Sequence, residues 1–432
     1  MKVLGLDIGT TTVSAVVTEE GRVCSALTLP NGSFLPSPHS WEKAQNPLII
    51  RQTALNAVEQ LLAEHPDVQR IGVTGQMHGI VYLDGRGEPV SPLYTWQDGR
   101  GDQPLPSGET YAAALGRITG YAVSTGFGLV THYYNVLNGL VPPQAAVFCT
   151  IHDYLAMLLA GSSVPVTDTS DAASFGLFDV EHGCFDLQAL EKAGISPSLL
   201  PSVAKTPRIG AYKDRIPVYT AIGDNQASFL GATGGKTSAM LVNVGTGSQF
   251  SAFSPHYMIC PGLETRPFPG GGYLLVGASL CGGRAYALLE SFFRSAAGMM
   301  TGTAPDSCYD AMARLLAQGR PADLPRLTPL FQGTRTDPTL RGSITGLSTE
   351  NFTPRHLLWA MLEGMAEELT GMYRSYLASG GTNAPLIGSG NGLRKNPFLQ
   401  RCFTEAFGCP LTLSDCAEEA ACGAALFARM CP

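Results

Sequence analysis

The segment VLGLDIGTTTVSAVV, residues 3–17, carries a carboxylate in the middle of an apolar strand pattern. An unpaired carboxylate inside a sheet is costly, so Asp7 needs a polar partner. Gly9, Thr10 and Thr11 follow at once. Backbone N–H groups and threonine hydroxyls in such a turn can bind phosphate oxygens, and glycine lets the backbone approach the anion. Beside a polyphosphate, Asp7 would bind Mg²⁺ directly or through water. The alternative is that Asp7 only accepts hydrogen bonds in a β-turn.

The same pattern returns 236 residues later, in SAMLVNVGTGSQFSAF. Residues 242–246 repeat the order apolar, polar, apolar, Gly, Thr of residues 6–10. Such a repeat can arise by chance, but it divides the chain almost in half, and both halves continue with strand and helix patterns. Gly245, Thr246 and Gly247 are therefore predicted to form a second phosphate-binding turn.

A third glycine-rich turn lies in LIGSGNGLRKN, residues 386–396. A strand pattern runs into Gly390 and Gly392, and a helix pattern follows Asn396. Adenine and ribose could lie against this bare backbone, with Asn396 bonded to the base or the sugar. An ordinary loop between a strand and a helix is the alternative.

Asp224 ends the apolar strand pattern VYTAIGD, and Asn225 follows it. Ligands of α/β sheets collect at the carboxyl ends of strands. A carboxylate there can accept the proton of a substrate hydroxyl while a phosphoryl group passes to that oxygen. The alternative is a helix N-cap.

Two further segments, GVTGQMHGIVYL and LYTWQDGR, combine amide, imidazole, carboxylate, guanidinium and indole groups. A polyol needs polar groups for its hydroxyls and a ring face for its C–H bonds. The candidate sugar-binding side chains are Gln76, His78, Trp96, Gln97, Asp98 and Arg100. A structural histidine at 78 and a surface ion pair between Asp98 and Arg100 are the alternatives.

Alternating strand and helix patterns must position these residues. The first 30 residues predict an antiparallel meander, and Asn46-Pro47 predicts the start of a helix over residues 48–65. The buried stripe of that helix is predicted to consist of Leu48, Leu55, Val58, Leu61 and Leu62. Thr353-Pro354 starts a second long helix, which Gly380-Gly381 ends. The predicted architecture is α/β, with one domain over residues 1–235 and another over residues 236–432.

Composition excludes several classes of protein. With 44% hydrophobic and 15% charged residues, the 432-residue chain is not disordered, and its net charge of −7 gives no field for nucleic acid or anionic lipid. The sequence predicts neither a signal peptide nor a membrane helix. Five of its 11 cysteines crowd the C-terminus, at positions 402, 409, 416, 422 and 431. Without histidine partners they are interpreted as buried thiols of a reduced, cytoplasmic protein.

The motifs GLDIGTTTVSAVV, TGQMHG, GDNQAS, NVGTGSQ and GSGNGLRKNPFLQ resemble, in this order, those of the FGGY carbohydrate kinases. The resemblance spans nearly the whole chain. It implies two RNase H-like domains of the actin/Hsp70/hexokinase superfamily that flank an ATP cleft. Within the family, LYTWQDGR, STGFG, TIHDYL and DTSDAASFGLFDV are most similar to the members that phosphorylate sedoheptulose.

The resemblance also implies a role for each matching residue. Asp224 would be the general base. Asp7, Gly9, Thr10 and Thr11 would form the first phosphate region, with Asp7 beside Mg²⁺, and Gly245, Thr246 and Gly247 the second. Gly390, Gly392 and Asn396 would lie at the adenosine. Gln76, His78, Trp96, Gln97, Asp98, Arg100 and Asn225 would touch the sugar. The turn at 390–392 reads Gly-Asn-Gly where family members commonly have a Gly-Gly-Ala type.

The sequence thus predicts an ATP- and Mg²⁺-dependent kinase that converts a ketose, in the first place sedoheptulose, into its 7-phosphate. A xylulose, ribulose or other polyol kinase is the alternative within the family. A nucleotide-driven binding or regulatory module on the actin-like fold is the alternative from another class. The expected partners are a sugar and ATP, without nucleic acid or membrane, and a homodimer is left open.

Overall fold

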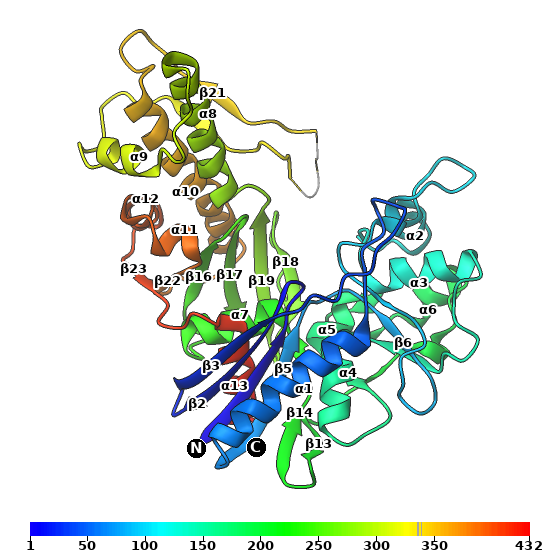
Figure 1. Ribbon diagram of the computed structural model, residues 1–432. Coiled ribbons are helices and arrows are strands. Elements are labelled where there is room, and N and C mark those ends of the chain that lie inside the picture. The colour runs from blue at the N-terminus through cyan, green and yellow to red at the C-terminus, as the bar shows by residue number, and fades with distance from the viewer. Residues whose placement is uncertain (335–336, 338) are drawn as a thin grey trace. The chain divides into compact units, whose positions relative to one another are not determined.

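A computed structural model describes residues 1–334, 337 and 339–432. The chain divides into two compact units (Figure 1). Unit 1 consists of Met1–Lys236, Arg266–Tyr273 and Cys416–Pro432, and unit 2 of Thr237–Thr265 and Leu274–Asp415.

Unit 1 is built on one mixed sheet with the order β13-β14-β5-β1-β2-β3, and β15 pairs with β5 beside β14. β1, β2 and β3 form the antiparallel meander expected from the sequence, while β5 runs parallel to β1, β14 and β15. The strands are β1 (Lys2–Ile8), β2 (Thr12–Glu19), β3 (Arg22–Pro30), β5 (Val68–Gly75), β13 (Arg208–Tyr212), β14 (Ile216–Tyr219) and β15 (Ile222–Gly223).

Some helices of unit 1 pack on this sheet, and others form a separate hydrophobic cluster with one another. The helices of this unit are α1 (Pro47–Glu64), α2 (Tyr111–Thr119), α3 (Gly128–Leu137), α4 (Ile151–Leu159), α5 (Thr169–Ser174), α6 (Leu187–Lys192), α7 (Asp224–Thr233) and α13 (Glu419–Met430), with the 3₁₀ turns η1 (Gly99–Asp102) and η2 (Pro197–Leu199). Short strand pairs complete the unit: β4 (Ala44–Gln45) with β7 (Leu93–Tyr94), β6 (Val81–Leu83) with β8 (Val147–Cys149), β9 (Val166–Thr167) with β12 (Ser202–Val203), and β10 (Phe178–Asp179) with β11 (Cys184–Phe185).

The alternation of side chains along β1 assigns its two faces. Leu4, Leu6 and Ile8 pack with Ile50 and other side chains of α1 in one fully buried core. Gly5 points to the opposite face, where a Cβ would lie 1.9 Å from the carbonyl oxygen of Ala421 in α13. Since residues two apart share a face of a strand, Asp7 belongs to the side covered by α13.

α13 packs as closely against α7 as against the sheet. A Cβ on Gly423 would lie 1.7 Å from the carbonyl oxygen of Ala227, so only glycine fits at this helix–helix contact. On β5, a Cβ on Gly72 would lie 2.0 Å from the carbonyl oxygen of Ala424. The last helix of the chain therefore completes the core of unit 1 and supports the helix that begins at Asp224.

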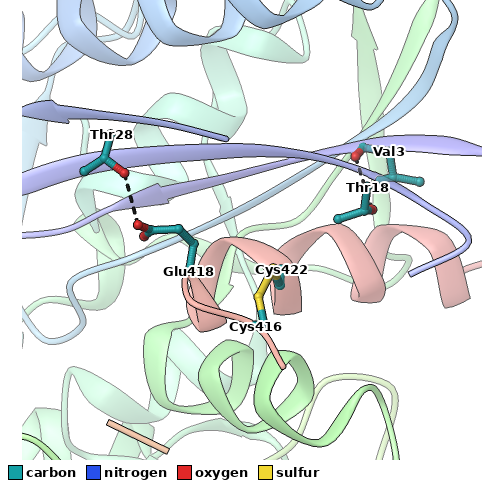
Figure 2. Close-up of a disulfide and its surroundings, with 6 residues drawn as sticks. All are labelled: Val3, Thr18, Thr28, Cys416, Glu418 and Cys422. Atoms are coloured by element: carbon teal, nitrogen blue, oxygen red, sulfur yellow. Dashed lines mark hydrogen bonds between the residues drawn. A yellow bond between two sulfur atoms is a disulfide. The ribbon is translucent and has the colours of Figure 1, made fainter. Parts of the chain in front are cut away.

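A disulfide joins Cys416 and Cys422 at the start of α13 (Figure 2). The prediction of buried thiols is therefore wrong for these two residues, because the turn before α13 brings Cys422, six residues later in the chain, back to Cys416. Cys402 and Cys431 are buried free thiols, as expected, whereas Cys409 is a free thiol that is only half-buried. Next to the disulfide, Glu418 accepts a hydrogen bond from the Thr28 hydroxyl at 3.1 Å, which ties this turn to β3.

Unit 2 repeats the central strand order on a second sheet, β18-β19-β17-β16-β22-β23. β16 pairs antiparallel with β17 and parallel with β22, as β1 does with β2 and β5. The strands of this sheet are β16 (Met240–Val244), β17 (Ser248–Ser254), β18 (Glu264–Pro267), β19 (Tyr273–Ser279), β22 (Leu386–Ser389) and β23 (Leu411–Leu413), with a separate pair β20 (Arg326–Thr328) and β21 (Ser343–Thr345). The end of β18 and the first residue of β19 belong to the segment Arg266–Tyr273 of unit 1.

The helices of unit 2 are α8 (Gly283–Thr301), α9 (Tyr309–Leu316), α10 (Pro354–Ala378), α11 (Asn391–Arg394) and α12 (Pro397–Phe407). Thr353 caps α10 by accepting a hydrogen bond from the backbone of His356, as the sequence predicts. The buried side of α10 packs with Val242 and Val244 of β16 and with Phe403 of α12 in one core. The short repeat in the sequence thus marks the same strand-turn-strand unit in both sheets.

Candidate active site

The carboxyl ends of three neighbouring parallel strands meet in unit 1. Asp7 of β1 lies opposite Thr74 of β5, and Gly75 at the end of β5 lies opposite Gly223 of β15. The residues that follow these strand ends are the Gly9 turn, Gln76 and Asp224. Parts of the sequence more than 200 residues apart therefore share one sheet edge, which is where α/β folds bind ligands.

The turn after β1 is held by side chains from other elements. Asn31 donates its amide N–H to the carbonyl oxygen of Gly9, and Gln45 donates to that of Thr10, both at 2.8 Å. The Thr10 hydroxyl donates to Oε1 of Gln76 at 3.3 Å. Thr11 is exposed. Neutral amide side chains thus hold the turn in place, and they add no charge next to the Asp7 carboxylate.

Burial raises the pKa of Asp7 to about 7, and the negative charges of Asp224 and Glu418 act in the same direction. A divalent ion bound to this carboxylate would lower its pKa. Within residues 1–334, 337 and 339–432, no group of three or more His, Cys, Asp or Glu side chains is arranged to hold a metal ion. These features fit Mg²⁺, which binds one or two carboxylates together with waters and substrate phosphates.

Asp224 is the first residue of α7, directly after β15. Asn225 donates its side-chain N–H to the Asp224 carboxylate at 2.8 Å. Burial raises the pKa of Asp224, while the bond from Asn225 and the charges of His152 and Arg266 oppose this rise. The N-terminus of α7 also favours a negative charge. The group is thus a carboxylate of raised basicity at the strand edge.

Gln76 and His78 follow β5. The amide of Gln76 is buried and donates to Oε1 of Gln45 at 2.9 Å. His78 has a left-handed backbone with φ of 72°, and its ring stacks on Phe127 with 4.6 Å between centroids. Its Nδ1 lies 2.7 Å from the carbonyl oxygen of Ser174, so Nδ1 carries a hydrogen that this oxygen accepts. The orientation of the His78 ring is thereby fixed.

Trp96 and Gln97 are exposed on the segment after β7. The indole N–H of Trp96 donates to the Thr10 hydroxyl at 3.0 Å. One predicted sugar-binding residue therefore contacts the predicted phosphate turn directly, which brings the two groups of candidates together.

Asp98 and Arg100 form an ion pair in the interior of unit 1. Arg100 is 2% exposed and Asp98 is 0% exposed, with Nε and Oδ1 at 2.6 Å. Arg100 also donates to Asn135 at 2.6 Å and lies 3.9 Å from the ring centroid of Tyr94. The structure therefore contains the ion pair that was the alternative interpretation of these two residues. The pair is buried, however, and does not lie at the surface.

In unit 2, the two remaining glycine turns are neighbours. The turn of Gly245, Thr246 and Gly247 follows β16, and Gly390 follows the adjacent parallel strand β22. Gly390 has φ of 83°, and a Cβ there would lie 2.5 Å from the carbonyl oxygen of Val244. Gly392 lies in α11, against the same Val244. This sheet edge therefore presents bare backbone from both turns.

Asn396 caps α12, because its side-chain oxygen accepts hydrogen bonds from the backbone N–H groups of Phe398 and Leu399, both at 3.1 Å. The cap uses the oxygen that would bind an adenine amino group. Any nucleotide contact of Asn396 would therefore be made by its side-chain N–H.

A groove of about 960 Å³ runs along α10 in unit 2. Its charged lining is predominantly acidic and consists of Arg320, Asp323, Arg326, Glu363, Glu367, Glu368 and Glu405. None of the predicted site residues, all of which the structure describes, lines it. An acidic groove is unsuited to polyphosphate.

Sequence reasoning missed a group of polar residues near Asp224, formed by the buried His152 and Asp153 of α4, the buried Asp171 of α5 and the half-buried Asp168 that caps α5. TIHDYL and DTSDAASFG contain these residues. A His-Asp pair directly after an apolar strand and an Asp-x-x-Asp spacing were the available signals. Neither signal shows that the two segments meet.

Comparison with known proteins identifies the family. Residues 2–231 match the N-terminal domain of the FGGY family of carbohydrate kinases, and residues 240–431 match the C-terminal domain of the same family. The chain belongs to the FGGY family of carbohydrate kinases. It is accordingly a sugar kinase, a phosphotransferase, with the two-domain fold of the actin/Hsp70/hexokinase type.

Individual FGGY kinases align over nearly their whole length. A sedoheptulokinase of Mus musculus is 30% identical, with 98% of this chain and 96% of the relative covered. A sedoheptulokinase of Homo sapiens is 30% identical over 86% of this chain and 84% of the relative. The crystal structure of a xylulose kinase from Rhodospirillum rubrum superposes with a TM-score of 0.85 at 26% identity, and covers 100% of this chain and 90% of that one. No helix in the described part of this FGGY kinase is long and apolar enough to cross a bilayer.

Proposed function

We propose that the protein transfers the γ-phosphoryl group of ATP to the terminal hydroxyl of a ketose, and that its principal substrate is sedoheptulose, which becomes the 7-phosphate. One observation carries this proposal. The strand edge of unit 1 joins a phosphate-type turn, a carboxylate of raised pKa and side chains suited to a polyol. The two sedoheptulokinases at 30% identity support the choice of sugar.

Asp224 is proposed as the general base. Its carboxylate accepts the proton of the attacking hydroxyl, and its raised pKa brings it closer to the neutral range in which a base is efficient. The bond from Asn225 fixes one carboxylate oxygen, so the other oxygen can face the substrate. A loose phosphoryl-transfer transition state needs mainly positioning and charge neutralisation, which a single base and two phosphate turns provide.

Each unit is proposed to contribute residues that bind nucleotide. In unit 1, Gly9, Thr10 and Thr11 bind phosphate oxygens and Asp7 holds Mg²⁺. In unit 2, Gly245, Thr246 and Gly247 bind phosphate, and Gly390, Gly392 and Asn396 lie at the adenosine. Mg²⁺ supplies charge neutralisation for the phosphates when it is bound. Residues 1–235 and 236–432 are proposed as the two functional domains, in a cytoplasmic enzyme.

The sugar is proposed to lie against the exposed ring of Trp96 and the Nε2 side of His78. Asn225, Gln76 and Gln97 supply amides for its hydroxyls. Asp98 and Arg100 bind each other in the interior, so their proposed contribution is to fix the segment that carries Trp96 and Gln97.

A coupled assay for ADP release tests the choice of sugar. The panel contains glycerol, xylulose, ribulose, fructose and sedoheptulose, each at several concentrations, and a reaction without sugar gives the ATPase background. We expect the highest kcat/KM with sedoheptulose. If kcat/KM is higher for xylulose or ribulose, that pentulose becomes the principal substrate and the assignment of sedoheptulose is wrong. Xylulose would agree with the similarity to the xylulose kinase that superposes on this chain.

Asp224→Asn tests the base separately from the sugar. The variant should bind ATP normally and lose transfer by about 10³-fold or more, because the amide cannot accept the proton. Gln97→Ala is the comparison from the same site, since it should raise the KM for the sugar without removing a group that takes part in proton transfer. Turnover of Asp224→Asn near the wild-type rate would refute the assignment of the base.

A further inference from the structure

Helices α4 and α5 bring polar residues against the strand end that carries Asp224. Gly75 at the end of β5 lies opposite Gly223, and a Cβ on Gly75 would lie 3.0 Å from the Cβ of His152 in α4. His152 is completely buried. His152 therefore lies in the protein interior, close to the junction between β15 and α7 at which Asp224 is located.

Ser170 of α5 binds the same junction through the backbone. The N–H of Gly223, one residue before Asp224, donates to the Ser170 hydroxyl at 3.1 Å. That hydroxyl donates to Oδ1 of Asp168 at 2.7 Å, and the backbone N–H of Ser170 donates to the same oxygen at 2.9 Å. The chain from Asp168 through Ser170 to Gly223 thus fixes the peptide from which Asp224 projects.

His152 and Asp171 form the second link. His152 Nε2 and Asp171 Oδ1 are 2.9 Å apart, and both side chains are 0% exposed. Burial lowers the pKa of His152 and raises that of Asp171, so it opposes a charge on either group. Electrostatic interactions connect both residues with Asp224. The pair thus places two buried polar groups beside the proposed base.

We propose that Ser170 and the His152–Asp171 pair are positioning residues, which hold the Asp224 carboxylate in the orientation that proton transfer from the sugar requires. This inference rests on the proposed role of Asp224. Ser170 fixes the backbone, and the pair fixes the charge environment of the carboxylate. Neither element touches the substrate, so both act through Asp224.

Ser170→Ala tests the backbone link. The substitution leaves the buried N–H of Gly223 without its acceptor. We expect kcat to fall about tenfold or more, because a small displacement of a reacting group is costly, while the KM values for sugar and ATP change by less than about twofold. Ser251→Ala is the matched control. It removes another buried serine hydroxyl, which accepts a hydrogen bond from Gln249 inside unit 2, and it should leave kcat unchanged.

His152→Gln and the double variant His152→Gln/Asp171→Asn test the pair. The titratable or charged groups that interact with Asp224 are Asp7 of β1, His152 of α4, Asp171 of α5 and Arg266 of β18. Loss of His152 leaves Asp171 without its partner and removes an interaction that lowers the pKa of Asp224. The acid limb of the kcat profile should therefore move up by about half a pH unit or more, and the double variant should return it toward the wild-type position.

Thermal unfolding and Asp224→Asn are measured in parallel. If kcat of Ser170→Ala and the pH profile of His152→Gln both match the wild type while Asp224→Asn is inactive, the positioning role is refuted and the base remains. If Asp224→Asn keeps its activity, the proposed base itself fails. A loss of kcat that follows only the loss of folded protein, with an unshifted pH profile, would show a purely structural role and also overturn the inference.

Discussion

The indole N–H of Trp96 is bonded to the hydroxyl of Thr10 at 3.0 Å, and that hydroxyl is bonded in turn to Gln76 at 3.3 Å. One threonine thus connects the turn proposed for phosphate with two side chains proposed for the sugar. The hydroxyl both accepts and donates, so replacing it breaks two contacts at once.

Thr10→Val should therefore impair the use of both substrates. We expect kcat/KM to fall about tenfold for the sugar and for ATP, since each lost hydrogen bond is worth about 1 kcal/mol. Trp96→Phe keeps a ring face but loses the N–H group, and it should affect the sugar more than ATP. Steady-state kinetics with each substrate varied in turn measures both effects. A Thr10→Val enzyme with altered KM for ATP alone would contradict this coupling.

Asp7→Asn should weaken the dependence on Mg²⁺ in a way that calorimetry can detect. Because the pKa of Asp7 is about 7, the group is about half protonated at pH 7, and a cation that binds there must displace the proton. Titration of Mg²⁺–ATP in two buffers with different ionisation enthalpies should show proton release for the wild type and less for Asp7→Asn. Equal proton release by the two proteins would exclude Asp7 as the ligand.

Gly423→Ala should destabilise unit 1, because the added methyl group would meet the carbonyl oxygen of Ala227 at 1.7 Å. Overpacking of this kind costs about 1–3 kcal/mol. Gly371→Ala, in the interior of α10 and with open space around it, is the matched control and should stabilise by up to about 1 kcal/mol through helix propensity. Urea denaturation followed by circular dichroism gives both values. A stable Gly423→Ala protein would show that α13 can move away from α7 at little cost.

Asp153 should make the stability fall as the pH rises. Burial, followed by the charge of Asp171, raises its pKa from 3.8 to about 8 in the folded protein. Unfolding therefore releases a proton between these values, so the contribution of Asp153 to the free energy of unfolding is fully present below pH 3.8 and is lost by about pH 8. Asp153→Asn should flatten the decline of the urea midpoint across this range. A parallel decline in both proteins would assign the effect to other groups.

Local sequence signals predict several local structures correctly. Asn46 caps α1 by accepting from the backbone of Leu48 at 2.9 Å, and the meander of the first 30 residues is present. The predicted buried stripe of α1 is only partly correct. Val58 and Leu61 are buried, but Leu48 is 46% exposed. Ile50, Ala54 and Ala57 are buried instead, in the core between α1 and the sheet. The prediction considered only leucine and valine for the buried stripe and therefore missed them.

Long-range pairings were beyond such signals. The motifs around Asp7, Asp224 and Gly245 were visible because each combines a strand pattern with glycine or an acid. The contact between His152 and Asp171, and that between Ser170 and Gly223, join segments that show no mutual signal in a single sequence. The disulfide of Cys416 and Cys422 depends on a turn that composition does not reveal.

The position of α13 has a consequence for how the protein folds during its synthesis on the ribosome. The first 236 residues emerge early, yet the face of β1 and β5 that carries Gly5 and Gly72 stays uncovered until residues 419–430 have been made. Throughout translation of unit 2, the nascent chain exposes part of an unfinished core. Native folding of unit 1 is therefore a late event in synthesis, and chaperones that bind apolar surface have a long interval in which to act.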